Sequence, residues 1–163
     1  MREFGESLRW VMRNWPSGVA IATGKFDSKI HGMTVNSFNS VSLYPPMVTV
    51  TLANDTRTHE LVVKSGYFGI TILNDQQRDI SERFAGKFAE QENRFVGLET
   101  FTLYSGSPFL QEGIGFVDCK VVHQYSMKAS TLFVGEVLAA KHVEEHPQPL
   151  IYFNRGYYQL NHD

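Results

Sequence analysis

The stretch YPPMVTVTL, residues 44–52, has the clearest strand pattern in the chain. Val48, Val50 and Leu52 alternate with threonines, which is typical of a strand with one buried face and one polar face. The two prolines restrict the backbone before the alternation begins, so we expect a rigid turn leading into the strand. This stretch therefore predicts a β-strand that is entered through a turn.

Short runs rich in β-branched and aromatic residues recur on both sides of this stretch, separated by turn residues. Together they predict about seven strands, at residues 19–23, 34–39, 47–52, 67–73, 116–125, 132–142 and 151–160. Two short helices are expected between them, at residues 57–64, closed by Gly66, and at residues 75–84. Helices inserted among antiparallel strands indicate a mainly β, α+β fold of the barrel kind.

Apolar residues near the amino terminus recur at helical spacing. They are Phe4, Leu8, Val11, Met12 and Trp15. This spacing places them on one stripe of a helix that ends before Pro16. We expect the stripe to pack on the larger body of the protein.

The composition is that of an ordinary soluble domain, and we expect residues 1–163 to form a single one. The formal net charge of −2 provides no broad positive field, so nucleic acid is not an expected partner. One cysteine, Cys119, cannot form a disulfide within the chain and indicates a reducing compartment. No segment resembles a signal peptide or a membrane span, so we expect a cytoplasmic protein with no membrane partner.

The histidines do not predict a metal site. Only His142 and His146 lie one helical turn apart, and Pro147 follows at once. No cysteine or carboxylate cluster completes a set of ligands. We therefore expect no metal.

A polar segment, GMTVNSFNS, occupies residues 32–40. In an extended strand, Thr34, Asn36 and Ser40 would share one face, with Ser37 on the other. Such a row of amides and hydroxyls could contact the polar edge of a heteroaromatic ligand. A solvated edge strand would explain the same residues, so both interpretations remain open.

A second polar segment, ANDTRTHE at residues 53–60, runs from the strand at 47–52 into a helix. Free backbone N–H groups at a helix start, together with threonine hydroxyls and Arg57, suit a phosphate monoester. An ordinary N-cap formed by Thr56 or Thr58 is the alternative.

The order of these segments resembles the flavin reductase-like family, whose members fold as an FMN-binding split barrel. The resemblance rests on the polar strand at 34–40, VSLYPP at 41–46, the loop at 53–61, FGITIL at 68–73, SERFAG at 81–86, TLFVGEV at 131–137 and PLIYF at 149–153. It covers nearly the full chain. It implies an antiparallel split β-barrel with an N-terminal helix and two short inserted helices.

The resemblance also implies a set of flavin contacts. The ring and ribityl chain would lie along Thr34, Val35, Asn36, Ser37 and Ser40. The ribityl chain and phosphate would be held by Ala53, Asn54, Asp55, Thr56, Arg57 and Thr58, and Arg83, Phe84 and Tyr152 would lie beside the flavin. Phe84 is equally well explained as core, because it shares a helical stripe with Ile80. Asp55 would repel a phosphate unless Arg57 or Lys64 offsets its charge.

The activity that the resemblance implies is reduction of FMN, with FAD possible, by NADH or NADPH through hydride transfer to the flavin N5. The reduced flavin or its electrons would pass to an acceptor such as a monooxygenase. Family members are often homodimers, so we expect a homodimer here.

One segment departs from the family pattern. Gly-Asp-His usually precedes the segment at 131–137, and its histidine belongs to the nicotinamide site, but this chain has Lys128-Ala129-Ser130. Lys128 could contact a pyrophosphate and Ser130 could donate a hydrogen bond. The departure leaves open an FMN-retaining electron-transfer or redox-sensing flavoprotein without an efficient nicotinamide site. A split barrel that binds another ligand, such as pyridoxal phosphate or haem, is a third hypothesis, because a fold does not fix a function.

Overall fold

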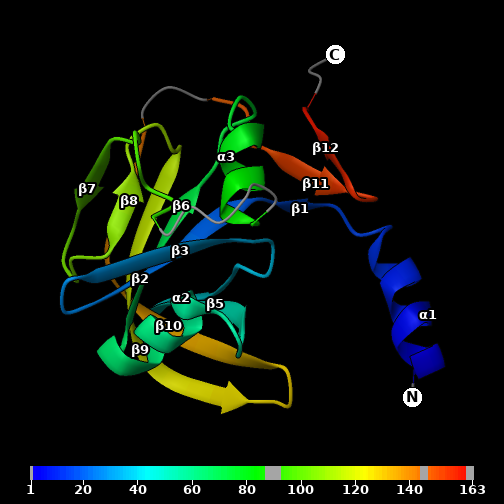
Figure 1. Cartoon of the computed structure of the whole chain (residues 1–163), viewed down its shortest axis with the longest axis horizontal. Coiled ribbons are helices and arrows are strands. Elements are labelled where there is room, and N and C mark those ends of the chain that lie inside the picture. Colours follow the sequence, from blue (N-terminus) through cyan, green and yellow to red (C-terminus); the bar gives the residue numbers. More distant parts are fainter. Residues whose placement is uncertain (1, 87–92, 144–146, 161–163) are drawn as a thin grey trace.

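A seven-stranded antiparallel sheet forms the body of the protein (Figure 1). The computed structural model describes residues 2–86, 93–143 and 147–160. Across the sheet the order is β3 (Lys29–Val35), β2 (Ala20–Phe26), β6 (Tyr67–Ile72), β9 (Gly115–Ser126), β10 (Ser130–His142), β5 (Pro46–Ala53) and β4 (Asn39–Leu43). The mainly β fold predicted from the sequence is confirmed.

Two smaller sheets flank this body. One joins β1 (Ser17–Gly18), β11 (Ile151–Phe153) and β12 (Gly156–Tyr158), and the other joins β7 (Thr100–Thr102) and β8 (Pro108–Leu110). The prediction of one continuous strand at 151–160 is wrong. Asn154 and Arg155 have φ angles of 45° and 64°, and this left-handed turn folds the segment into a hairpin.

The barrel remains open between β3 and β4, which lie at opposite edges of the sheet. The continuous strand predicted at 34–39 is wrong, because residues 36–38 leave one edge and cross to the other. The side chain of Ser37 ties this crossing segment to β5: its hydroxyl accepts the Thr51 N–H at 3.1 Å and donates to the Thr51 carbonyl at 2.9 Å. A side chain thus makes the hydrogen bonds that a paired backbone would otherwise make, and the fold is a split barrel.

Two helices pack on the body, α2 (Arg57–Ser65) on β2 and α3 (Arg78–Phe84) on β3. Helix α2 ends at Gly66, whose φ of 75° and N–H bond to the Val62 carbonyl at 2.8 Å form the expected C-terminal cap. Helix α3 begins later than the predicted residue 75. The cause is a turn in which the Asn74 N–H donates to the Gln77 side chain at 2.9 Å.

The core consists of two clusters of buried side chains. One fills the barrel and includes Val50, Phe68 and Phe133, and the other lies beneath α3 and includes Leu73 and Phe84. Gly135 on β10 makes room for the first cluster, since a Cβ there would lie 2.5 Å from the Phe68 ring. Any larger residue at this position would displace the ring.

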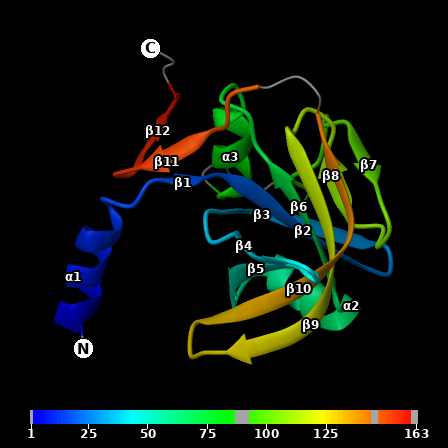
Figure 2. The same cartoon turned by 180° about the vertical axis from the view of Figure 1, so that it is seen from behind.

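Helix α1 (Arg2–Met12) lies apart from the sheets, as both views show (Figures 1 and 2). The predicted helix is confirmed, but the prediction that its stripe packs on the body of the same chain is wrong. The exposed fractions are 78% for Phe4, 60% for Leu8, 64% for Val11 and 69% for Trp15. None of the helices in the described ranges is long and apolar enough to cross a membrane.

Candidate functional site

The start of α2 is formed by a threonine cap. Thr56 has extended backbone angles, φ −98° and ψ 146°, and its hydroxyl accepts the His59 N–H at 3.3 Å. The same hydroxyl donates to the Ala53 carbonyl at 2.8 Å. The capping interpretation is therefore confirmed for Thr56, and its proton is already used within the loop.

Thr58 points into the protein. Its side chain is completely buried, and its hydroxyl lies 2.8 Å from Nδ1 of His31 on β3. Neither threonine is available to a phosphate, because Thr56 donates its hydroxyl proton to the Ala53 carbonyl and Thr58 is completely buried. The neighbouring side chain of Arg57 is exposed.

Burial and two nearby guanidinium groups lower the pKa of His31. The pKa of His31 is lowered to about 4, first by burial and then by the positive charges of Arg94 and Arg57. Arg94 is held in place by Nη1, which donates to the carbonyls of Gly32 at 3.0 Å and Phe84 at 2.7 Å. His31 and Arg94 were not among the site residues predicted from the sequence. Arg94 lies 62 residues from Gly32, so no local pattern joins them.

The polar segment at 34–40 divides into residues used by the fold and residues that face solvent. Thr34 donates its hydroxyl proton to the Ser81 carbonyl of α3 at 2.6 Å, and Val35 is buried in the barrel core. The Ser37 hydroxyl is used by the fold as well, in its two hydrogen bonds to the Thr51 backbone of β5. Asn36 and Ser40 are exposed and can meet a ligand.

The β-hairpin between β9 and β10 lies against the loop that precedes α2. In the β5–β10 ladder Ala53 pairs with Ser130, and the Asn54 N–H donates to the Ala129 carbonyl at 3.1 Å. The proposed phosphate loop and Lys128-Ala129-Ser130 are therefore neighbours in space. Lys128 is exposed and Ser130 is half-buried.

Three more candidates lie elsewhere in the fold. Phe84 is completely buried, with its ring 5.1 Å from that of Phe95, so it is a core residue in this chain and not a surface for a ligand. Arg83 donates to the Val96 carbonyl at 2.6 Å. Tyr152 lies on β11, in edge contact with the Tyr157 ring at 5.5 Å.

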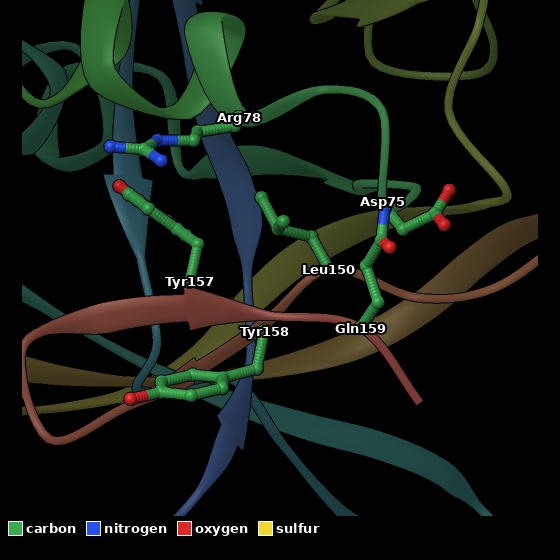
Figure 3. Close-up of a pocket in the computed structure, with 6 residues that line it drawn as sticks. All are labelled: Asp75, Arg78, Leu150, Tyr157, Tyr158 and Gln159. Atoms are coloured by element: carbon green, nitrogen blue, oxygen red, sulfur yellow. The ribbon is translucent and has the colours of Figure 1, made fainter. Parts of the chain in front are cut away.

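A cavity of about 410 Å³ opens beside the sheet of β1, β11 and β12 (Figure 3). It is lined by Asp75, Arg78, Leu150, Tyr157, Tyr158 and Gln159. The Arg78 guanidinium lies 5.5 Å from the centre of the Tyr157 ring, and the Tyr157 hydroxyl is 2.9 Å from that of Ser81. None of the site residues predicted from the sequence lines this cavity.

Residues 12–161 match the family model described as a flavin reductase like domain. The chain belongs to this family. It is 33% identical over 153 residues to the NADH-dependent flavin reductase StyB of Pseudomonas fluorescens, a match that covers 93% of this chain and 87% of that protein. It is 34% identical over 157 residues to the reductase component of the FADH(2)-dependent resorcinol hydroxylase of Rhizobium sp. (strain MTP-10005), covering 94% and 86%.

A solved structure extends the similarity to three dimensions. The NADH:FAD oxidoreductase SgcE6 of Streptomyces globisporus C-1027, in complex with NAD and FAD fragments, has a TM-score of 0.89 and 25% identity to this chain. The match covers 100% of this chain and 96% of that one. The resemblance to the flavin reductase-like family, and the split barrel that it implied, are thereby confirmed.

Exposed polar groups remain on both segments that the sequence predicted as flavin contacts. Asn36 and Ser40 present an amide and a hydroxyl, and Arg57 presents a cation at the first turn of a helix. The first N–H groups of a helix have no carbonyl partner one turn earlier. The Thr56 cap takes the N–H of His59, so those of Arg57 and Thr58 are the ones that can serve an anion. In the described part of the chain, no group of three or more His, Cys, Asp or Glu side chains could hold a metal ion, and His146 lies outside that part.

Proposed function

We propose that this protein is an NAD(P)H-dependent flavin reductase that uses FMN or FAD. The pairing of Ala53 with Ser130 carries the proposal, because it sets the candidate phosphate loop beside the candidate nicotinamide hairpin. Membership of the flavin reductase-like family, over residues 12–161, supports the same activity.

At the flavin end, the protein supplies binding and orientation, and the bound flavin supplies the redox chemistry. Asn36 and Ser40 hydrogen-bond the polar parts of the flavin. Arg57 and the first N–H groups of α2 hold its phosphate through charge-assisted hydrogen bonds. Asp55 is exposed, so solvent and salt weaken its repulsion of that phosphate.

At the nucleotide end, Lys128 pairs with the pyrophosphate of NADH or NADPH, and Ser130 donates a hydrogen bond. These residues occupy the segment in which the family resemblance implies Gly-Asp-His. No side chain of the site has to act as an acid or a base, because hydride passes between the two bound nucleotides.

The test is an anaerobic titration of the protein, loaded with FMN or with FAD, by NADH and then by NADPH. Single-turnover conditions and flavin absorbance give the rate of reduction. Rapid bleaching by either nucleotide supports a reductase. Flavin that stays oxidised with both but is reduced by dithionite would favour the electron-transfer or sensor alternative, which the Lys128-Ala129-Ser130 replacement supports.

We also propose a homodimer, in which the apolar stripe of α1 packs on a second copy. An isolated helix of this length, 11 residues, is marginal in water and needs a packing partner. Every copy also exposes an apolar strip near β4, where Leu43 is 73% and Tyr44 95% exposed. Aromatic side chains bury roughly 150–250 Å² each, so reciprocal packing of the stripe and the strip approaches the ~800 Å² per partner of a stable interface.

The proposed acceptor is a monooxygenase that takes the reduced flavin. In support, the Rhizobium relative is named as the reductase component of an FADH(2)-dependent hydroxylase. Anaerobic ultrafiltration after reduction tests this, since reduced flavin should pass the membrane while the protein is retained.

The proposed location is the cytoplasm. Cys119 is buried, and burial followed by the charge of Asp118 raises its pKa to about 12, so it stays a thiol there.

A further inference from the structure

Asn54 bonds the β9–β10 hairpin through its backbone and both ends of its side chain. Its N–H donates to the Ala129 carbonyl at 3.1 Å, and its Nδ2 donates to the Met127 carbonyl at 3.0 Å. Its Oδ1 accepts the hydroxyl proton of Thr131 at 2.8 Å. One residue of the loop before α2 thus bonds three alternate residues of the hairpin, at 127, 129 and 131.

The same network extends into α2. Thr131 is 2% exposed, and Nε2 of His59 lies 2.9 Å from its hydroxyl oxygen. Thr131 has a single hydroxyl proton and gives it to Asn54, so His59 must donate to Thr131 through an Nε2–H. The His59 ring also packs against Phe133, with centroids 5.5 Å apart. The first turn of α2, the loop and the hairpin therefore form one hydrogen-bonded unit.

The tip of the hairpin needs such support. The β9–β10 pairing ends at Ser126 and Thr131, and residues 127–129 beyond it are exposed. A turn bond from the Met127 N–H to the Ser130 carbonyl, at 2.8 Å, holds the tip to itself. That bond fixes the shape of the turn but not its position relative to α2. The position is fixed by the end of the β5–β10 ladder, where Ala53 pairs with Ser130, and beyond it by the bonds from Asn54.

We propose that Asn54 is a positioning residue that holds the hairpin tip at a fixed distance from the start of α2. This inference rests on the proposed function, which assigns the flavin phosphate to the α2 start and the nicotinamide nucleotide to the tip. The Asn54 side chain then contacts the protein's own backbone, and it sets the geometry between the two nucleotides without touching the reacting atoms.

The test compares Asn54→Ala with Asn74→Ala. Asn74 is a matched control, because its Nδ2 donates to the Glu112 carbonyl at 3.0 Å and its Oδ1 accepts the Gln76 N–H at 2.8 Å, in another part of the fold. The first readout is amide hydrogen exchange of the hairpin in the ligand-free protein. The second is KM for NADH against kcat at saturating flavin.

For Asn54→Ala we expect exchange about tenfold faster at the hairpin tip, and KM for NADH raised about tenfold with a smaller change in kcat. A tenfold change is the size of one or two net hydrogen bonds. Asn74→Ala should leave both the tip exchange and KM unchanged. Thr131→Ser should behave as wild type because it keeps the hydroxyl, whereas Thr131→Val should loosen the tip.

Unchanged exchange in Asn54→Ala, or an equal rise in KM in Asn74→Ala, would overturn the proposal. If wild type shows no turnover with either nucleotide, the proposed function fails. Faster exchange confined to the tip of Asn54→Ala would then still support Asn54 as the residue that positions the hairpin.

Discussion

The region around the start of α2 and helix α1 differ in whether their side chains find partners within the chain. At the α2 end, Asn54, Thr131 and His59 pair their polar groups with one another within a single chain. At the α1 end, Leu8 and Trp15 leave more than half of their surface in water. The first end pairs these polar groups within one copy, whereas the second exposes an apolar face, which is the surface of the proposed dimer.

The largest expected effect is the difference in stability between truncating a buried phenylalanine, Phe84, and truncating an exposed one, Phe4 of α1. Phe84→Ala should destabilise the fold by about 3–5 kcal/mol, because it empties a fully buried site against Phe95. Phe4→Ala on α1 should change the stability of the monomer by less than about 0.5 kcal/mol. Chemical denaturation of both variants measures the difference, and flavin affinity per folded molecule should be unchanged in Phe84→Ala. A specific loss of flavin by that variant would restore Phe84 as a ligand contact.

The next effect concerns the exposed cation at the α2 start. Arg57→Ala should weaken flavin nucleotide binding by about 1–3 kcal/mol, since it removes a charge-assisted hydrogen bond to phosphate. Lys64→Ala is the control, because Lys64 is exposed on the same helix and pairs with Glu60 at 2.6 Å. Fluorescence titration with FMN gives both affinities. Equal affinities in the two variants would remove Arg57 from the site.

A smaller effect is expected on the dissociation constant of the proposed dimer, and it tests the apolar stripe of α1. Leu8→Ala should weaken the dimer by roughly 1 kcal/mol, about fivefold in its dissociation constant, because it removes apolar area from the α1 stripe. Glu6→Gln on the polar face, where Glu6 pairs with Arg9 at 2.8 Å, should leave the dimer unchanged. Sedimentation equilibrium measures the constants. A monomeric wild-type protein at all concentrations would contradict the proposed dimer.

The smallest effect at neutral pH is the one from His31. In the folded chain its pKa is about 4, against 6.5 as the ordinary value, so the unfolded chain binds more protons between these two pH values. Stability therefore falls as pH is lowered from 6.5 toward 4, and this contribution is constant above that window. His31→Asn should flatten that part of the stability profile, while His142→Asn, at an exposed position, should not. A slope that survives His31→Asn would assign the acid sensitivity to other groups.

The sequence predicted the elements whose signals are local. The alternation in residues 44–52 became β5, and Gly66 closed α2 where its conformational freedom is needed. The capping interpretation of residues 53–60 was right for Thr56. Each of these features depends on neighbours within a few residues, so periodicity and residue type are sufficient to find it.

The site was only partly predictable. The sequence placed Thr56, Arg57 and Thr58 together as phosphate contacts, yet the structure leaves only Arg57 exposed among them. Thr58 turns inward because His31, on a different strand, supplies its partner. Asn54 was predicted as a phosphate contact, but its amide bonds a backbone carbonyl 73 residues away. No single-sequence pattern carries such long-range partners.

The sequence by itself determined the strands with local signals, such as β5, and the caps of α2. It also determined helix α1 with its apolar stripe and the resemblance to a family of flavin reductases. Only the tertiary structure decided that the strand is interrupted at residues 36–38, where the chain crosses from one edge of the sheet to the other, and that Ala53 pairs with Ser130. The physical reason is that sheet register and side-chain pairing depend on which strands meet, and that choice is made by the burial of the whole core rather than by local preference.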